Sequence, residues 1–273
     1  MKSIVKASFA ALACAAAMVG TAHADQLADI KARGTLVCGV LSNLEPFGFQ
    51  DPNTRELAGY DIDFCKGIAK SLGVKPELKA VSLEARIPEL SQGRVDILAA
   101  VLGYTPARAE QIAFSEAYFV SEHRLAVKTT GPYSQRDDLA GKRISTIKGA
   151  SSALFVQKVL PSAQLVSYDD APSAFMALVQ GKVDGFGLSE SMLRRFVAKL
   201  GPSGNIKVIS PSIGREDWGL GIKKGEPALE KAVNAALDNM EKSGEAAQIF
   251  DKWLGEKTLF QMKREFRIQP IKG

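Results

Sequence analysis

Arg108 is the residue of this chain whose setting first suggests chemistry. It follows a Thr-Pro turn in the segment YTPARAEQIAFSEAYFV (residues 104–120), just before an apolar run that contains Glu116. The guanidinium group is a planar fork of donors that can bind a carboxylate at two points, which a lysine cannot do. A surface turn can also hold an arginine for solubility alone, so residue type and spacing leave both interpretations open.

The segment GASS (149–152) is a second candidate for binding an anion, because it opens a helical pattern. Exposed backbone N–H groups at a helix start bind anions, and a serine hydroxyl adds one more donor. Ser151 is the candidate ligand contact. The alternative is that Ser151 or Ser152 merely caps the helix.

Catalytic and metal-binding patterns are poorly supported. His123, in the strand-like segment HRLAV, is the only histidine after residue 24, so a Ser-His-Asp site is not indicated. One histidine, two separated cysteines and no close carboxylate cluster do not make a metal site. The sequence predicts no metal and no cofactor.

The first 24 residues predict a signal peptide that is cleaved after Ala24. Lys2 and Lys6 precede an apolar stretch that ends in the small-x-small pattern Ala-His-Ala at residues 22–24. The stretch is too short and too rich in alanine to span a membrane. We therefore expect a soluble protein exported to the periplasm.

The remaining 249 residues are enough for two modest domains or one large one. Loss of the two lysines lowers the formal net charge from +5 to +3, and no lysine or arginine run appears, so nucleic acid is not an expected partner. Cys38 and Cys65 remain in a compartment where disulfides persist. Two buried thiols are the alternative.

Short Val/Ile/Leu runs alternate with helical patterns along the chain, which predicts an α/β fold with mostly parallel sheets. The expected strands are 35–41, 77–83, 94–101, 142–149, 163–169 and 182–188, and the expected helices are 60–73, 86–90, 151–160, 171–180, 226–243 and 245–254.

One helix-to-strand corner occurs twice, in ELSQGRVDILAAV (89–101) and in ALVQGKVDGFGLS (177–189). Gly93 and Gly181 suit the left-handed position after a helix, and a buried strand follows each. The repeat predicts two similarly built lobes. Open α/β sheets bind ligands at the carboxyl ends of their strands, so Arg108 is expected at the mouth of the cleft.

Five segments, in order, resemble successive blocks of the family 3 solute-binding proteins: GYDIDFCKGIAKSLGV, RIPELSQGRVDILAA, YTPARAEQIAFSEAYF, DDLAGKRISTIKGASS and SGEAAQIFDKWLG. The resemblance implies a two-lobed periplasmic binding protein fold (type II), with two Rossmann-like lobes joined by a two-strand hinge. We expect lobe 1 to comprise 25–124 and 220–273 and lobe 2 to comprise 125–219. Hinge strands are expected near 124–128 and 217–222.

The function implied by the resemblance is a monomeric receptor that captures a small carboxylate-bearing ligand, an amino acid above all, and delivers it to the membrane permease subunits of an ABC importer. The residues implied to bind the ligand carboxylate are Arg108 and Ser151. Gly103 stands where a serine or threonine is usual, so only its backbone can contribute. Glu116 belongs to a strand block and is expected to be structural.

The place of the aspartate that binds the ligand ammonium in most amino-acid receptors of the family is taken by Ser189, with Glu190 next to it. Three explanations are open. Glu190 reaches in to replace the aspartate, Ser189 binds the amine weakly, or the ligand lacks a standard α-ammonium group. A buried ammonium without compensation costs several kcal/mol, which makes weak binding by Ser189 the poorest of the three.

Further departures concern ligand specificity. Arg86 occupies a place where an arginine meets the side-chain carboxylate in relatives that bind glutamate or aspartate, and the alternative is a helix-surface ion pair with Glu84 or Glu89. Leu44 stands, with Leu83, where many relatives have an aromatic pair around the ligand side chain.

Two residues next to these are assigned to structure. Phe47 is expected to pack in the core and not to line the cleft. Cys38 and Cys65 lie on a strand and on the helix that follows, and a similar pair recurs in some broad-specificity relatives, so we expect a disulfide.

The rival function is enzymatic, because a few relatives are periplasmic dehydratases that act on cyclic carboxylates. Such an enzyme keeps the carboxylate-binding arginine and needs a general acid, for which Glu190 is the candidate. We favour a receptor over an enzyme, since uptake needs only binding and closure. Whether the partner is a permease or a membrane sensor leaves no mark in the sequence.

Overall fold

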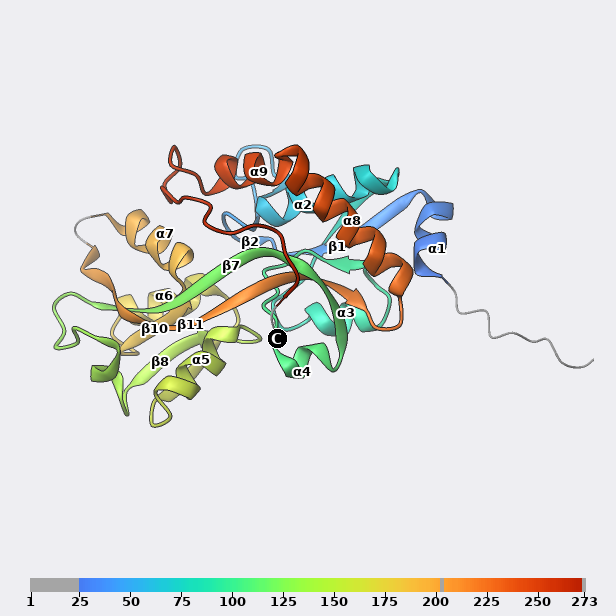
Figure 1. Cartoon of the computed structure of the whole chain (residues 1–273). Helices are drawn as coiled ribbons and strands as arrows, with labels where there is room; N and C mark the ends of the chain where they lie inside the picture. Colours follow the sequence, from blue (N-terminus) through green and yellow to red (C-terminus); the bar gives the residue numbers. More distant parts are fainter. Residues whose placement is uncertain (1–24, 202–203, 272–273) are drawn as a thin grey trace, which may run out of the picture.

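A computed structural model describes residues 25–201 and 204–271 of the chain (Figure 1). The expected signal peptide, residues 1–24, lies outside this part. One eight-stranded sheet, in the order β5-β1-β6-β11-β7-β10-β8-β9, runs through the molecule. Its strands are β1 (Thr35–Val40), β5 (Lys75–Ala80), β6 (Ile97–Leu98), β7 (Ile112–Lys128), β8 (Arg143–Ile147), β9 (Gln164–Tyr168), β10 (Gly185–Ser189) and β11 (Ile206–Lys223).

The two halves of this sheet belong to two lobes, which confirms the predicted fold class. In lobe 1, β1 is parallel to β5 and β6, and in lobe 2, β8 is parallel to β9 and β10. The helices of lobe 1 are α1 (Gln26–Arg33), α2 (Tyr60–Leu72), α3 (Arg86–Ser91), α4 (Pro106–Ala109), α8 (Pro227–Ser243) and α9 (Glu245–Trp253). Lobe 2 contains the short helix η1 (Arg136–Leu139), α5 (Ser151–Val159), α6 (Ala171–Val179) and α7 (Glu190–Leu200). A small sheet in lobe 1 is formed by β2 (Asn43–Leu44), β3 (Gly48–Gln50) and β4 (Leu57–Ala58).

The long strands β7 and β11 connect the lobes as an antiparallel pair (Figure 1). The pairing runs from Lys128↔Ile206 in lobe 2 to Ile112↔Lys223 in lobe 1, with breaks of register between Ile209 and Gly214 and again around Gly219. The segments expected to cross between the lobes, HRLAVKT and DWGLGIKK, lie in these two strands. The exact hinge positions and lobe boundaries stay predictions.

The repeated helix-to-strand corners have the expected backbone. Gly93 has φ 68° and Gly181 has φ 74°, which confirms the left-handed conformation that glycine adopts without strain. The strand expected over 94–101 is only Ile97–Leu98, because the chain turns away after it and Val101 has φ 46°. After this early turn, the carbonyls of Ala100 and Val101 accept hydrogen bonds from the side chain of Arg86.

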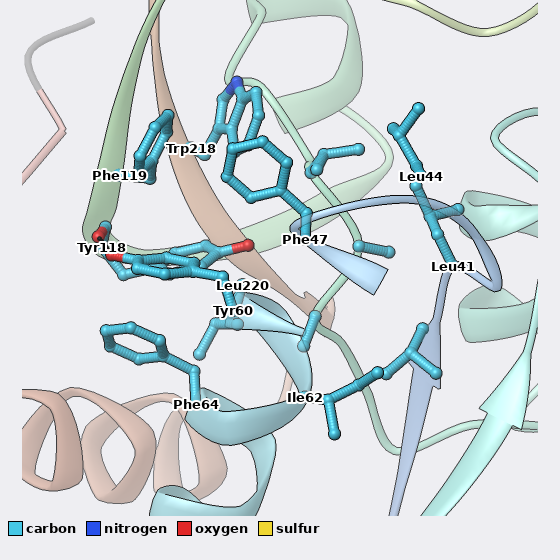
Figure 2. Close-up of a cluster of buried hydrophobic side chains, with 14 of the residues drawn as sticks. Leu41, Leu44, Phe47, Tyr60, Ile62, Phe64, Tyr118, Phe119, Trp218 and Leu220 are labelled. Carbon is cyan, nitrogen blue, oxygen red and sulfur yellow. Dashed lines mark hydrogen bonds between the residues drawn. The ribbon is translucent and has the colours of Figure 1, made fainter. Parts of the chain in front are cut away.

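An aromatic cluster at the centre of lobe 1 supports the floor of the cleft. Figure 2 shows Phe47 beside Phe119 and Trp218, with ring centroids 5.1 Å and 4.8 Å from that of Phe47. Phe47 is fully buried, as predicted. Burial of each such side chain stabilises the fold by about 1.5–3 kcal/mol. Trp218 on β11 is therefore held firmly in the core.

The predicted disulfide is confirmed. Cys38 on β1 and Cys65 on α2 are bonded, with their Cα atoms 6.4 Å apart. The bond ties the first strand of lobe 1 to the helix packed on it. No helix in the described ranges 25–201 and 204–271 is long and apolar enough to cross a bilayer.

Candidate functional site

Arg108 is positioned by the Thr-Pro turn that precedes it. Thr105 is the N-cap of the one-turn helix α4, and its hydroxyl accepts a hydrogen bond from the Arg108 backbone N–H at 3.2 Å. Pro106 at the first helical position has the φ that a helix needs and lacks the N–H that would stay unpaired there. The turn thus holds the backbone of Arg108 in place independently of its side chain.

The Arg108 side chain reaches across the cleft from lobe 1 to lobe 2. Its Nη1 donates to the Gly103 carbonyl at 2.7 Å and to Ser151 Oγ at 3.0 Å, and its Nη2 donates to the Gly149 carbonyl at 2.8 Å. Burial lowers the pKa of the guanidinium, and the negative charge of Glu216 opposes that shift. Arg108 stays charged all the same, and it lies at the contact between the lobes, as a carboxylate anchor should.

Gly149 lies at a close contact between the two lobes. Its φ is 74°, and a Cβ built on it would lie 2.9 Å from the Leu83 carbonyl oxygen of lobe 1. Its own carbonyl accepts hydrogen bonds from both Arg108 and Arg86, each at 2.8 Å. Glycine at this position is therefore needed both for the backbone conformation and for the approach of the lobes.

Ser151 and Ser152 begin α5 but do not cap it. The N-cap of α5 is Ala150, and no side chain accepts a capping hydrogen bond there. The capping alternative is therefore wrong in this structure. Ser151 instead contacts Arg108, so the fold brings together the two residues that the sequence singled out for an anion.

Arg86 supports the backbone of the cleft. It is 2% exposed, and its guanidinium donates to the carbonyls of Leu83 (2.8 Å), Ala100 (2.7 Å), Val101 (2.8 Å) and Gly149 (2.8 Å). Burial, followed by the charge of Arg108, lowers its pKa to about 9.

The ion-pair alternative for Arg86 is not observed. Glu89 pairs with Lys79 and Arg94 instead, each at 3.1 Å. Since every guanidinium nitrogen of Arg86 already donates to a carbonyl, its setting does not favour the capture of a ligand carboxylate.

Ser189 and Glu190 lie at the junction of β10 and α7, where the family aspartate was expected. Ser189 is 1% exposed, and within the described ranges its hydroxyl has no hydrogen-bond partner. Glu190 is bound by Arg124 Nε at 2.6 Å and by Arg194 at 2.5 Å. Burial alone would raise the pKa of Glu190, but the hydrogen bonds and charges of these arginines lower it overall. Glu190 is thus already paired with two arginines, Arg124 on β7 and Arg194 on α7, and not with Arg108.

Leu44 lines a cavity of about 260 Å³ between the lobes, together with Leu83. Its walls are residues 42–44 and 80–83 of lobe 1 and residues 169–171 at the start of α6 in lobe 2. Leu83 also abuts Gly149, so this cavity lies next to the Arg108 contacts. The position suits a ligand side chain that extends away from the carboxylate anchor.

Sequence reasoning missed Glu216, which lies on β11 against Gly103, next to the Arg108 contacts. Its Oε1 accepts hydrogen bonds from His123 Nε2 at 2.9 Å and from Trp218 Nε1 at 2.8 Å, and the residue is 7% exposed. A Cβ on Gly103 would lie only 1.9 Å from Glu216 Oε2, so the carboxylate fills the space of the missing side chain. No short-range signal could reveal this contact, since Gly103 and Glu216 lie far apart in the sequence.

The charge state of Glu216 follows from its partners. Burial raises its pKa, but the charge and hydrogen bond of His123, the nearby hydroxyl of Ser151 and the hydrogen bond of Trp218 lower it overall. A carboxylate only accepts hydrogen bonds, so His123 Nε2 is the donor. In the part of the chain that the structure describes, no group of three or more His, Cys, Asp or Glu residues could hold a metal ion.

Comparison with known proteins places the chain in a family. Residues 36–256 match the family model of the bacterial extracellular solute-binding proteins, family 3. The chain therefore belongs to this family, as its segments indicated, and an extracellular or periplasmic location follows. The glutamine-binding protein GlnH of the ABC transporter of Bacillus subtilis (strain 168) is 30% identical over 236 residues, which cover 85% of each chain.

Two solved structures share the two-lobed fold. An ancestral arginine-binding protein bound to arginine is 33% identical, with a TM-score of 0.76 over 82% of this chain and 99% of its own. The ancestral amino acid-binding protein AncCDT-1, a precursor of cyclohexadienyl dehydratase, is 30% identical, with a TM-score of 0.76 over 85% of this chain and 100% of its own. This chain is a solute-binding receptor of the amino-acid type that serves ABC transporters.

Proposed function

We propose that this protein captures a small α-amino acid in the periplasm and delivers it to the permease subunits of an ABC importer. The observation that carries the proposal is the contact of Arg108 from lobe 1 with Gly149 and Ser151 from lobe 2. A charged fork of donors and the start of α5 there converge on one point of the cleft, and both favour a carboxylate. The ligand carboxylate is bound at this point as the lobes close.

The ligand proposed here is not an acidic amino acid. Arg86, the candidate partner for a second carboxylate, donates from each nitrogen of its guanidinium to backbone carbonyls. The cavity at Leu44 and Leu83 accepts the side chain of the ligand. Its walls combine these two aliphatic residues with the acidic residues Asp169 and Asp170, which disfavour a negatively charged side chain and suit a neutral or basic one.

We further propose that the protein binds its ligand without converting it. A dehydratase needs a general acid with a raised pKa, whereas the pKa values of Glu190, the candidate acid, and of Glu216 are both lowered. The likeness to AncCDT-1 does not favour an enzyme, because AncCDT-1 is itself described as an amino acid-binding protein.

Closure is proposed to occur by bending of β7 and β11, with lobe 1 formed by residues 25–124 and 220–273 and lobe 2 by residues 125–219. The two chain crossings allow the lobes to rotate as rigid bodies. A monomer is sufficient, since every residue of the proposed site comes from one chain. Small-angle scattering should therefore give a monomer mass and a smaller radius of gyration once the ligand is bound.

A thermal-shift screen of the mature protein tests the function. The panel holds the standard amino acids, linear dicarboxylates and cyclic carboxylates, since a ligand that binds the folded state raises the melting temperature by mass action. We expect a neutral or basic amino acid to give the largest shift and to be recovered unchanged by mass spectrometry. A cyclic carboxylate that is consumed, or a panel in which no amino acid binds, would overturn the proposal.

A further inference from the structure

The carboxylate of Glu216 has one oxygen without a hydrogen-bond partner in the described residues. Glu216 Oε1 accepts the hydrogen bonds of His123 and Trp218, whereas Oε2 is buried and has no hydrogen-bond partner of acceptable geometry in residues 25–201 and 204–271. A buried polar atom without a partner is costly, so this oxygen calls for a donor. In a binding protein, a bound ligand can supply this hydrogen-bond donor to Glu216 Oε2.

The free oxygen lies beside the residue that Arg108 contacts. It lies against Gly103, at 1.9 Å from where a Cβ of that residue would be. The carbonyl of the same Gly103 accepts the hydrogen bond of Arg108 at 2.7 Å, so the guanidinium and the carboxylate flank one residue. An α-amino acid has its carboxylate and its ammonium on one carbon atom, and it matches this pair of opposite charges.

The two residues considered first for the ammonium are less suited to it. Glu190 is engaged by Arg124 and Arg194, and removing it from them would break charge-assisted hydrogen bonds. The hydroxyl of Ser189 has no charge. Glu216 is by contrast kept in place through Oε1 while Oε2 remains available.

Charge balance also favours Glu216. It is the carboxylate whose negative charge acts on both buried guanidinium groups, those of Arg86 and Arg108. A zwitterionic ligand adds one charge of each sign, so an ammonium at Glu216 and a carboxylate at Arg108 leave neither ligand charge unpaired. A carboxylic acid without an ammonium would leave Glu216 Oε2 buried and unpaired.

We propose that Glu216, whose carboxylate occupies the space that glycine at position 103 leaves open, binds the ammonium group of the ligand through Oε2. The proposal rests on the proposed function, because it assumes that Arg108 binds the ligand carboxylate. It makes Glu216 the specificity-determining residue that selects amino acids over other carboxylates, and it explains how the family aspartate can be replaced by Ser189.

Calorimetry with matched probe pairs tests this role in the mature protein. The pairs are L-glutamine with 4-carbamoylbutanoate and L-arginine with 5-guanidinopentanoate, together with the equivalent pair for any other amino acid that the thermal-shift screen selects. Within each pair, hydrogen replaces the ammonium and the carboxylate is kept. We expect the wild-type protein to prefer the amino acid by about 30-fold or more.

The Glu216→Gln variant should abolish this preference. Its amide can still accept from His123 and Trp218, but it turns an NH₂ group toward the ligand ammonium. The affinity for the probe without an ammonium should change by less than about threefold. If the role of Glu216 were purely structural, the variant would instead lose affinity for both probes of a pair by the same factor. The control is Glu122→Gln, since Glu122 is a 47% exposed side chain on β7 and should leave the preference unchanged.

Each outcome decides the proposal. The role of Glu216 would be overturned if the wild-type protein bound both probes of a pair equally while still requiring Arg108. It would also be overturned if the Glu216→Gln variant kept the preference for the amino acid. Either result would leave the receptor function intact. A wild-type protein that binds no probe would overturn both. If Glu216→Gln does not fold, Gly103→Ala takes its place, because its methyl group must displace Glu216 Oε2 and should reduce the preference.

Discussion

Truncation of Arg108 should abolish ligand binding while leaving the fold intact. The side chain makes three hydrogen bonds, two of which, to Gly149 and Ser151, join lobe 1 to lobe 2. Arg108→Ala therefore removes both the carboxylate anchor and the contacts that favour the closed state. Loss of one charged partner from a closed, desolvated site costs about 2–5 kcal/mol, which is about 30-fold to several-thousand-fold in affinity.

Arg108→Lys should recover little of this loss, because one ammonium group cannot reproduce a two-point contact with a carboxylate. Both variants should melt near the wild-type temperature, since the turn at Arg108 is held by the Thr105 hydroxyl and by Pro106. Calorimetry with the amino acid selected by the thermal-shift screen measures the affinity. The control is Arg94→Ala, which removes a 49% exposed guanidinium outside the cleft. An Arg108→Ala variant with near-wild-type affinity would refute the reasoning and leave Arg108 as a turn residue.

Three further predictions concern closure, stability and pH. Gly149→Ala should weaken binding at least about tenfold by calorimetry, because its Cβ would press on lobe 1, whereas Gly141→Ala, with a similar φ of 73° and no atom within 4 Å, should not. The double variant Cys38→Ala/Cys65→Ala should lose about 3–4 kcal/mol in urea unfolding, as expected for a sequence separation of 27, and an unchanged midpoint would contradict this. Burial raises the pKa of Asp61 from 3.8 to about 7, so the folded state keeps a proton that the unfolded state loses over this range, and stability should fall as the pH rises from about 4 to 7. Asp61→Asn should flatten that fall in melting scans, and an identical pH profile would count against the raised pKa.

Much of the fold could be predicted because the strands and helices follow from local patterns of apolar residues and glycines in the sequence. Apolar periodicity indicated most strands and helices of both lobes, although α1 and α7 were not among the expected helices. The glycines at 93 and 181 marked the corners at which helix gives way to strand. The strand expected over 94–101 shrank to Ile97–Leu98 because tertiary contacts compete for its backbone. Asp61 accepts from the Val101 N–H at 2.9 Å, and Arg86 binds the carbonyls that follow β6. Such competition involves residues that are distant in sequence, so periodicity cannot reveal it.

The sequence by itself determined the family and the two-lobed fold, and it singled out Arg108 as the proposed carboxylate anchor. Those properties depend on residue types at fixed spacings, which the chain displays directly. Only the tertiary structure revealed the partners of the individual site residues. Arg86 donates hydrogen bonds to backbone carbonyls, and Glu190 pairs with two arginines. Gly103 lies against the carboxylate of Glu216. The physical reason is that a buried charge takes its role from the donors and acceptors that folding brings within about 3 Å. His123 on β7 and Glu216 on β11, for example, meet although they are 93 positions apart in the sequence.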